Sequence, residues 1–256
     1  MKTIDIVNKA REKGRATSVD YISNIFDEFI ELHGDKSFSD DEAIVSGIGS
    51  IDDIPVTIIG IEKGKSTEEK IRRNFGSVNP EGYRKALRQM KLAEKFKRPV
   101  ICFVDTSGAY CGIGAEERGQ GYAIAQNLME MMTLKTPVLS ILIGEGGSGG
   151  ALALAVADEV WMMENSIYSV ISPEGCASIL WKDTKRVAEA AECLKITAKD
   201  LLNMEVIEKI VDEPENFSDV YLEMHKNIVD FINRYSDKEN LVENRYNRFR
   251  KFGRLK

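Results

Sequence analysis

Residues 137–157 read PVLSILIGEGGSGGALALAVA. The apolar run from Pro137 to Ile143 predicts a buried β-strand, and the run from Ala151 to Ala157 predicts a short apolar helix. Between them lie five glycines in seven residues, from Gly144 to Gly150, and such a loop lets the backbone approach a ligand closely. A strand, a glycine-rich loop and a helix in this order indicate an α/β layered fold with functional loops at the strand ends.

Three kinds of site fit the heptapeptide from Gly144 to Gly150. Its glycine spacing, with Glu164 twenty residues after Gly144, matches a dinucleotide-binding fingerprint. Ser148, with glycines two residues away on each side, matches the nucleophile elbow of serine hydrolases, and His225 lies further along. At the start of a helix, the same turn presents N–H groups that stabilise an oxyanion. The plain alternative is a tight packing turn without a chemical role.

The surroundings of the turn favour the oxyanion interpretation. The predicted helix from Ala151 to Ala157 covers only about two turns, which is short for a dinucleotide fold. His225 lies within a helix-forming segment, and His33 precedes Gly34 at a predicted helix end, where contact with the helix dipole is the ordinary role. Neither histidine is well placed as a general base, so catalysis by a histidine is not expected.

Strand and helix patterns also alternate on both sides of this turn. They predict one α/β domain over residues 1–256, with a helical segment at 1–40 and a charged helical surface arm at 216–256. The N-terminal helix is predicted from the spacing of Val19, Ile22, Ile25, Phe26, Phe29 and Ile30. The other predicted elements are a hairpin of 43–48 and 55–61 around Asp52-Asp53, helices at 79–97 and 116–132, strands at 99–105, 160–163 and 167–171, and a helix that begins after Ser172.

Composition excludes several classes of protein. A net charge of −6 argues against a general nucleic-acid binder, which would carry a basic surface. No run approaches the roughly 18 apolar residues of a membrane span, and the N-terminus lacks the apolar core of a secretory signal, so we expect a cytoplasmic protein. The four cysteines are isolated and show no C-x-x-C spacing, so neither a zinc ribbon nor another metal site is expected in this chain.

Two loops and a basic segment are further candidates for binding. The loop from Asp105 to Gly119 follows a strand and is rich in glycine, while Ser172-Pro173-Glu174 caps a helix at another strand end. The segment from Lys63 to Gly76 concentrates basic residues in an acidic protein. It is either a solvated face or a site that approaches a CoA phosphate or an acidic partner surface.

These motifs together resemble the alpha subunit of bacterial acetyl-CoA carboxylase carboxyltransferase. The resemblance runs from about Val19 to Phe249, and it is most specific in YSVISPEGCASILWK, residues 168–182. The other segments that carry it are Lys63-Gly64, 72–76, 80–88, 112–120 and 143–152. Ser107 and Cys111 stand where the family commonly has prolines, which we interpret as tuning of the loop rather than loss of activity.

The resemblance implies a crotonase-like spiral of ββα units with N- and C-terminal helical extensions. It also implies transfer of a carboxyl group from carboxybiotin, borne on the biotin carboxyl carrier protein, to the CoA thioester acetyl-CoA, giving malonyl-CoA for fatty acid biosynthesis. The implied partners are a beta subunit with a zinc ribbon, in an α2β2 heterotetramer, and biotin carboxylase in the wider complex. Both intermediates of this reaction are oxyanions, which need N–H donors more than an acid–base side chain.

The resemblance also implies roles for particular residues. The N–H groups of Gly149 and Gly150 form the oxyanion hole that faces biotin, with Gly147 and Gly108 beside it. The residues expected to bind substrate are Tyr110, Gly112, Gly114, Ser172, Glu174, Arg72 and Arg73. Two hypotheses outside the family remain, namely a hydrolase that uses Ser148 and an inert scaffold that only assembles with other subunits.

Overall fold

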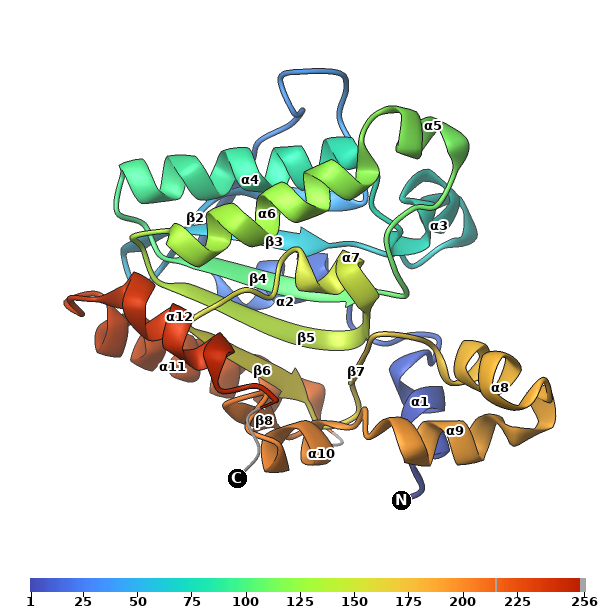
Figure 1. The fold of residues 1–256 in the computed structure, drawn as a ribbon. Coiled ribbons are helices and arrows are strands. Elements are labelled where there is room, and N and C mark those ends of the chain that lie inside the picture. Colours follow the sequence, from blue (N-terminus) through green and yellow to red (C-terminus); the bar gives the residue numbers. More distant parts are fainter. Residues whose placement is uncertain (215, 254–256) are drawn as a thin grey trace.

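The computed structural model describes residues 1–214 and 216–253, and within them the strands form one eight-stranded sheet (Figure 1). The strand order is β1-β2-β3-β4-β5-β6-β8, and β7 pairs with the end of β5. The strands are β1 (Glu28–Glu31), β2 (Ile44–Ile51), β3 (Ile54–Ile61), β4 (Val100–Thr106), β5 (Val138–Gly147), β6 (Glu159–Met163), β7 (Ile167–Ser169) and β8 (Lys209–Val211). From β3 onward all pairings are parallel, so the carboxyl ends of these strands share one edge.

The antiparallel hairpin predicted near the N-terminus is confirmed as β2 and β3. Asp52 and Asp53 form its turn with φ of 47° and 60°, the left-handed geometry that matches the twist of a two-residue hairpin. The first parallel strand after the hairpin, β4, is buried along its whole length, as expected for a strand covered on both faces.

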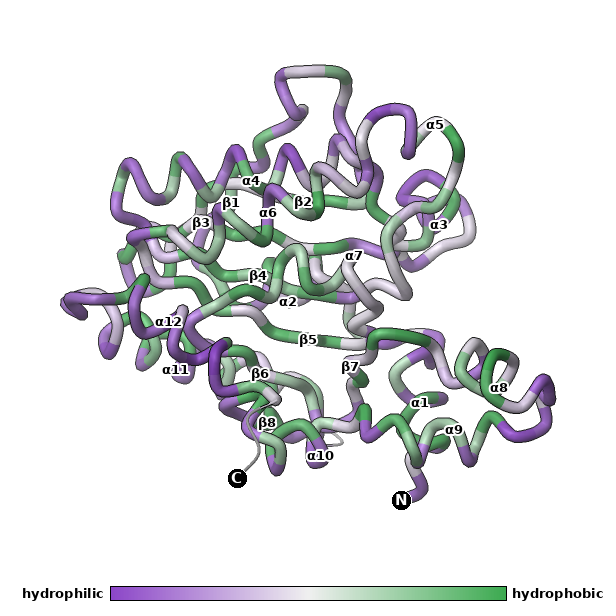
Figure 2. Tube along the Cα trace, viewed as in Figure 1, coloured by the Kyte–Doolittle hydropathy of each residue, from purple (hydrophilic) through white to green (hydrophobic). Residues whose placement is uncertain are grey.

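Helices cover both faces of the sheet (Figure 1). On one face, α4 (Pro80–Lys95), α6 (Gln120–Thr133), α7 (Ser148–Leu152) and α10 (Ala198–Asn203) enclose one apolar core. On the other, α2 (Ser18–Ile25) and α11 (Phe217–Tyr235) enclose a second core. Figure 2 shows the strands as largely hydrophobic and the outer side of α4 as hydrophilic. No helix in the described residues is long and apolar enough to cross a membrane.

A smaller lobe lies beside the carboxyl ends of the strands (Figure 1). It consists of α1 (Thr3–Ala10), α8 (Pro173–Trp181) and α9 (Val187–Leu194), and it has apolar clusters of its own around Val7 and Cys176. The remaining helices are α3 (Thr67–Arg72), η1 (Asn74–Gly76), α5 (Ile113–Glu117), η2 (Thr184–Arg186) and α12 (Leu241–Arg250).

The predicted N-terminal helix is wrong beyond Ile25, because Phe29 and Ile30 belong to the edge strand β1. Their spacing suits a helix, but pairing with β2 prevails. Gly47 lies opposite β1, where an added Cβ would lie 2.0 Å from the carbonyl oxygen of Ile30. The absence of side chains there lets the β1 backbone approach closely.

Three other predictions need correction. The helix expected at 151–157 begins earlier, at Ser148, and ends at Leu152. The helix expected at 116–132 is two helices, α5 and α6, that meet at Gly119 with φ of 83°. The C-terminal segment is not a free surface arm, because α11 buries one whole side against the sheet and Arg245 of α12 is fully buried. Residues 254–256 of that predicted arm lie outside the described residues.

Candidate active site

The glycine-rich turn joins β5 to α7 at the carboxyl edge of the sheet. Gly147 is the N-cap of α7, and Ser148 opens the helix with a φ of 51°. The first N–H groups of any helix lack intrahelical acceptors, and Gly147 has no side chain to cap them. The N–H groups of Gly149 and Gly150 therefore have no acceptor within the helix and can donate to a ligand.

Two of these glycines are required because two loops meet at the turn. A Cβ on Gly147 would lie 2.1 Å from the carbonyl oxygen of Ser107, and one on Gly150 would lie 2.5 Å from the nitrogen of Ala109. A Cβ on Gly149 would be 3.7 Å from Ile124, an ordinary contact. The structure thus brings the predicted Gly147 and Gly150 against the loop that contains Gly108, while Gly149 has free space beside it.

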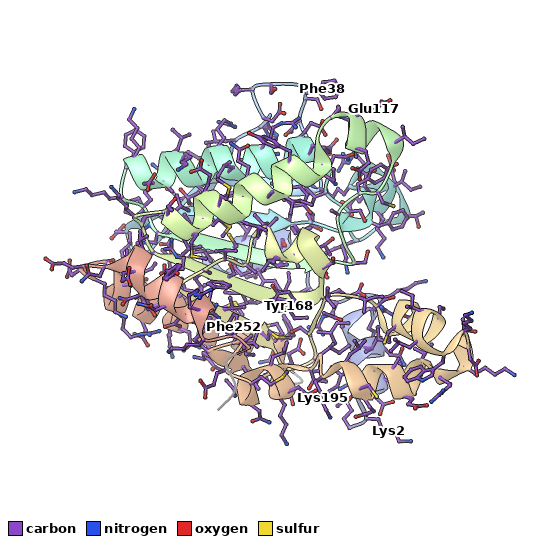
Figure 3. The ribbon with its side chains drawn as sticks, viewed as in Figure 1. Lys2, Phe38, Glu117, Tyr168, Lys195 and Phe252 are labelled. Atoms are coloured by element: carbon purple, nitrogen blue, oxygen red, sulfur yellow. The ribbon has the colours of Figure 1, made fainter. Side chains whose placement is uncertain are left out.

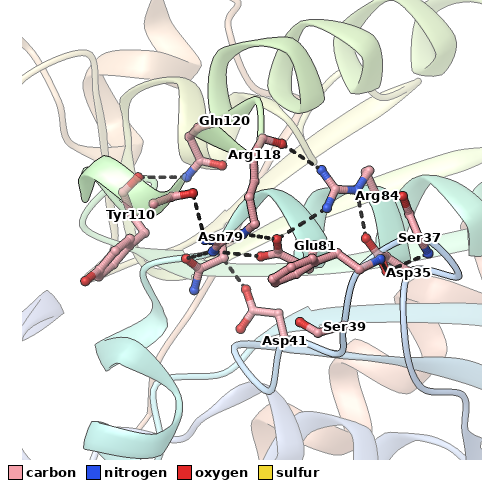
Figure 4. Close-up of polar contacts among 12 residues, drawn as sticks. Asp35, Ser37, Ser39, Asp41, Asn79, Glu81, Arg84, Tyr110, Arg118 and Gln120 are labelled. Atoms are coloured by element: carbon pink, nitrogen blue, oxygen red, sulfur yellow. Dashed lines mark hydrogen bonds and ion pairs between the residues drawn. The ribbon is translucent and has the colours of Figure 1, made fainter. Parts of the chain in front are cut away.

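The loop after β4 is held in place by the buried side-chain amide of Gln120 and by the backbone carbonyl group of Val78. Tyr110 donates its backbone N–H to the carbonyl oxygen of Val78 over 3.0 Å. The side-chain nitrogen of Gln120 donates to the carbonyl oxygens of both Val78 and Tyr110 over 2.8 Å (Figure 4). The Tyr110 ring is partly exposed, so the fixed backbone presents this side chain at the surface.

Gly112 and Gly114 belong to the outer part of the same loop. Gly112 lies against the Tyr110 ring, and the Gly114 carbonyl oxygen accepts from Arg118 over 2.7 Å. Arg118 in turn forms an ion pair with the buried Glu81 at the start of α4 (Figure 4). Neither glycine is among the residues that line the two cavities beside α7, so they are not brought together with Gly149 and Gly150.

A largely apolar cavity of about 410 Å³ opens beside α7. Figure 3 labels two of its lining residues, Tyr168 and Phe252, which lie below α7. The lining residues are Ser148, Gly149, Leu152, Ala155, Val160, Tyr168, Ser169, Val170, Leu201, Val206, Arg248, Phe249 and Phe252. The open side of Gly149 thus faces a cavity that suits an apolar ring.

A second cavity of about 60 Å³ lies between the turn and α8. Gly147, Ser172 and Arg11 are among its lining residues. The Ser172 hydroxyl accepts from the N–H of Gly175 and caps α8, and the Glu174 carboxylate forms an ion pair with Arg11 at 2.8 Å. The predicted Ser172 therefore reaches the turn, whereas Glu174 already has a cationic partner.

Charged side chains gather behind the turn where β4 and β5 end. The Lys63 ammonium lies 2.7 Å from Asp105 and 3.0 Å from Glu145, and Arg11 lies 2.7 Å from Glu145. Burial alone would lower the pKa of Lys63, but the two carboxylates raise it above its ordinary value. Burial alone would raise the pKa of Glu145, but Lys63 and Arg11 lower it. Lys63 and Glu145 are therefore charged near neutral pH.

The predicted Arg72 and Arg73 lie apart from the turn. Arg72 forms an exposed ion pair with Glu42 at 3.0 Å, and Arg73 donates to the carbonyl oxygen of Glu42 over 2.7 Å. Neither lines a cavity beside α7. The following turn approaches the site, because a Cβ on Gly76 would lie 3.0 Å from the carbonyl oxygen of Asp105.

The two histidines exclude a Ser–His hydrolase at Ser148. His225 lies 3.3 Å from Asp52 in the β2–β3 turn, which is the opposite end of the sheet from the carboxyl end of β5. His33 follows β1 at the far edge of the sheet and contacts Asp40 at 2.9 Å. A dinucleotide site is also disfavoured, because α7 has only five residues. Among the described residues, no group of three His, Cys, Asp or Glu side chains is placed to share a metal ion.

A family model described as acetyl co-enzyme A carboxylase carboxyltransferase-like matches residues 1–253. The chain belongs to this family. It is 61% identical over 258 residues to the acetyl-coenzyme A carboxylase carboxyl transferase subunit alpha of Ruminiclostridium cellulolyticum, covering 100% of this chain and 99% of that protein. The protein of the same name from Streptococcus equi subsp. equi is 60% identical over 250 residues, covering 96% of this chain and 98% of that one.

Solved structures of carboxyltransferases share the fold of this family member. Transcarboxylase 12S superposes with a TM-score of 0.75 at 17% identity over 93% of this chain. The beta subunit of geranyl-CoA carboxylase from P. aeruginosa gives a TM-score of 0.69 at 17% identity over 94% of this chain. The chain spans only 45% and 46% of the lengths of those two chains. The crotonase-like α/β fold expected from the sequence is confirmed.

No sequence pattern brings Lys63, Glu145 and Arg11 of this carboxyltransferase-like chain together, although Lys63 begins the basic segment and Glu145 lies in the glycine-rich heptapeptide. They are far apart along the chain, and contacts at such separations leave no local spacing to recognise. The one available signal is that Lys63-Gly64 and the turn containing Glu145 both belong to the segments that carry the family resemblance.

Proposed function

We propose that this chain is the alpha subunit of an acetyl-CoA carboxylase carboxyltransferase, which transfers a carboxyl group from carboxybiotin to acetyl-CoA to form malonyl-CoA. The observation that carries the proposal is the close-packed glycine turn, whose N–H groups stand beside a cavity with an apolar lining. The family membership and the names of the relatives at 61% and 60% identity support it.

The turn fits a biotin group by two criteria. The ring system of biotin is largely apolar and carries one polar ureido oxygen, and the cavity of about 410 Å³ combines an apolar lining with the open face of Gly149. Tyr168 and Phe249 supply aromatic surface to that lining. We propose that these residues hold the ring and that the N–H groups of Gly149 and Gly150 contact the ureido oxygen.

The chain's own chemical part is to place N–H donors where negative charge develops. When bound, carboxybiotin supplies the carboxyl group. Fixed donors stabilise developing charge on an oxygen without reorganisation during the reaction, and one such donor is typically worth about 10²–10³ in rate. Gly147 and Gly150 keep the turn against Ser107 and Ala109, so the donors are already oriented. This explains how the site operates without a histidine.

The roles of the other predicted residues rest on their positions. Ser172 lines the small cavity beside Gly147 and is proposed to contact the substrate there. Tyr110, Gly112, Gly114 and Glu174 are proposed to border the approach to the turn. Arg72 and Arg73 would have to exchange Glu42 for a CoA phosphate, which a surface ion pair permits because it contributes only about 0–1 kcal/mol.

Partner subunits are part of the proposal. Relatives named as an alpha subunit imply other subunits, and the chain matches less than half of the solved carboxyltransferase chains. We propose that a zinc-ribbon beta subunit supplies the other half in an α2β2 assembly. Biotin carboxyl carrier protein would deliver carboxybiotin, biotin carboxylase would complete the complex, and the assembly would work in the cytoplasm.

The test compares malonyl-CoA formation by the chain alone and mixed with a beta subunit and carboxylated carrier protein. We expect no product from the chain alone and turnover with the mixture. Gly150→Ala should reduce turnover about 10²–10³-fold, because the new Cβ would displace the turn and misaim its donors. Gly121→Ala in α6 is the matched control, since nothing lies within 4 Å of its Cβ position.

Two outcomes would overturn the proposal. Robust turnover by the chain alone would reject the half-enzyme. A Gly150→Ala variant that melts like the control, assembles with the beta subunit and transfers carboxyl at the wild-type rate would reject the oxyanion role. Gly149→Ala adds a methyl group without a clash, so a loss of turnover there reports on the cavity rather than on packing.

A further inference from the structure

A continuous chain of ion pairs runs behind the glycine turn. In order, it comprises Asp105, Lys63, Glu145, Arg11 and Glu174, each within 3.0 Å of the next. It links the ends of β4 and β5 to the start of α8 through side chains from the loops after β3 and α1. None of its lysine or arginine side chains has a role in the transfer described above.

Lys63 joins the two strand ends that carry the loops of the site. Its ammonium lies 2.7 Å from the Asp105 carboxylate and 3.0 Å from the Glu145 carboxylate. The side chains of Lys63, Asp105 and Glu145 are only 20%, 10% and 12% exposed, respectively. The same Asp105 carboxylate accepts the backbone N–H of Glu145 over 2.8 Å. The backbone two residues before Gly147 is therefore fixed to β4 by one carboxylate, and Lys63 holds that carboxylate.

The position of the turn depends on this junction. Gly147 and Gly150 contact Ser107 and Ala109, which follow Asp105 by two and four residues. A change in the separation of the β4 and β5 ends would shift these contacts and the direction of the N–H groups. A misplacement of about 1 Å at a reacting centre can cost about 10²-fold in rate.

Arg11 extends the restraint from the turn to the lobe. Its Nε donates to Glu145 over 2.7 Å and its Nη1 to Glu174 over 2.8 Å. The apolar cluster that contains the α8 residues Cys176 and Ala177 includes no strand residue, so apolar packing alone does not fix α8 against the turn. A guanidinium with donors on two sides suits this bridging position.

We propose that Lys63 is a positioning residue that sets the glycine turn through Asp105 and Glu145, and that Arg11 transmits the same restraint to the start of α8. This inference rests on the proposed function, because the turn is the oxyanion site there. Lys63 acts through the backbone of the turn and does not itself touch the reacting groups.

The first test measures steady-state carboxyl transfer by the complex with the beta subunit. Lys63→Met should lower kcat about 10- to 100-fold, with the KM for acetyl-CoA changed less than about twofold. Lys63→Arg should recover most of the rate, because it keeps a cation with several donors. Lys91→Met is the matched control, since Lys91 also bridges two elements, through Glu94 and Glu130, but far from the turn. It should behave as wild type.

The second test does not depend on activity. Hydrogen exchange of the amides of Glu145 and Ala153, which donate to the Asp105 carboxylate and to the carbonyl oxygen of Gly149, should be about tenfold faster in Lys63→Met than in wild type or Lys91→Met, because the turn loses its restraint. Arg11→Gln should speed exchange both there and at the start of α8. If Lys63→Met does not fold, Glu145→Gln neutralises one of the two carboxylates that hold Lys63 while keeping the shape of the side chain.

The outcomes separate this proposal from the proposed function. Wild-type kcat and unchanged exchange in Lys63→Met would overturn the positioning role while carboxyl transfer stands. Faster exchange in a complex that never transfers carboxyl would support the positioning of the turn and reject only the proposed reaction. A fall in melting temperature alone, with normal kcat and exchange, would show that Lys63 only stabilises the fold and would also overturn the proposal.

Discussion

Ion pairs between basic and acidic side chains lie at both ends of β5, but they differ in how far they are buried. At the amino end, Arg245 and Asp158 form an ion pair with side chains that are 0% and 2% exposed. At the carboxyl end, Lys63 and Arg11 form ion pairs with Glu145. The side chains of these three residues are 12–33% exposed, and they border two cavities. A closed pair and an open chain of pairs thus occupy the two ends of one strand.

The amino-end pair is fully saturated. Arg245 donates to both Asp158 oxygens over 3.1 and 2.7 Å, and to the carbonyl oxygens of Met131, Leu134 and Thr136. Asp158 also accepts the N–H of Val138, the first residue of β5. These bonds fasten α12 to the strand. The carboxyl-end chain instead has groups at cavity walls, where they can respond to a ligand. The closed pair at the amino end secures the fold, and the open chain at the carboxyl end orients the glycine turn.

The largest expected effect comes from breaking the closed pair. Arg245→Met should lower the free energy of unfolding by about 3–5 kcal/mol, because it leaves Asp158 as an unpaired buried charge. For a chain of this size, the melting temperature should fall by about 10 °C. Thermal and urea unfolding measure the change, and Arg250→Met on the exposed side of α12 is the control. A change of less than about 1 kcal/mol in the free energy of unfolding would contradict a special role of this pair in securing the fold.

An intermediate effect, dependent on pH, is expected at the open end. Glu145→Gln should cost about 2 kcal/mol at pH 7, since hydrogen bonds to charged groups contribute about 1.5–3 kcal/mol. The folded pKa of Glu145 lies below its ordinary value, so its stabilisation is present above the unfolded pKa and is lost as pH falls through the folded pKa. The difference in the free energy of unfolding between wild type and variant should therefore begin to shrink as pH falls below about 4.3, the ordinary pKa of glutamate, and should narrow further with each step down in pH. A difference that does not shrink as pH falls would contradict this ionic role.

The smallest effect is expected at Ser148, which lies at the open end but bears no charge. Ser148→Ala should keep turnover within about threefold of wild type, whereas loss of a nucleophile would cost orders of magnitude. Its hydroxyl is exposed, and neither histidine is near. A covalent adduct on Ser148, detected by intact mass during turnover, would show that the open end does chemistry through this side chain.

Local patterns predicted much of the fold. The short apolar runs around residues 100–106 and 138–143 identified β4 and the start of β5, and Asp52-Asp53 identified the hairpin turn. Edge strand β1 was missed because its apolar spacing suits a helix and only the glycines of β2 reveal the pairing. Arg245 was missed because a charged helical segment resembles a solvated surface until its partner Asp158, 87 residues away, is known.

The site also combines residues encoded by a local sequence pattern with residues that only distant contacts bring together. Gly147 and Gly150 were predictable because a backbone turn is encoded within a few adjacent residues. The contacts of Lys63 and Arg11 with Glu145 were not, because they span 82 and 134 residues. Gly112 and Gly114 show the converse limit, because their loop has the composition of a binding loop but neither glycine lines a cavity beside α7.

The lobe around α1 can fold only after a long stretch of chain has been synthesised. The N–H of Thr3 donates to Glu192, 189 residues later, and α1 packs against α9. Helix α1 therefore leaves the ribosome before its partner exists, because 189 residues separate Thr3 from Glu192. The sheet strands from β2 to β6 can pair earlier, because their partners follow within shorter stretches. Since contacts between distant residues form late, we expect the lobe to close last, and Arg11 to reach Glu145 only after the glycine turn has been built.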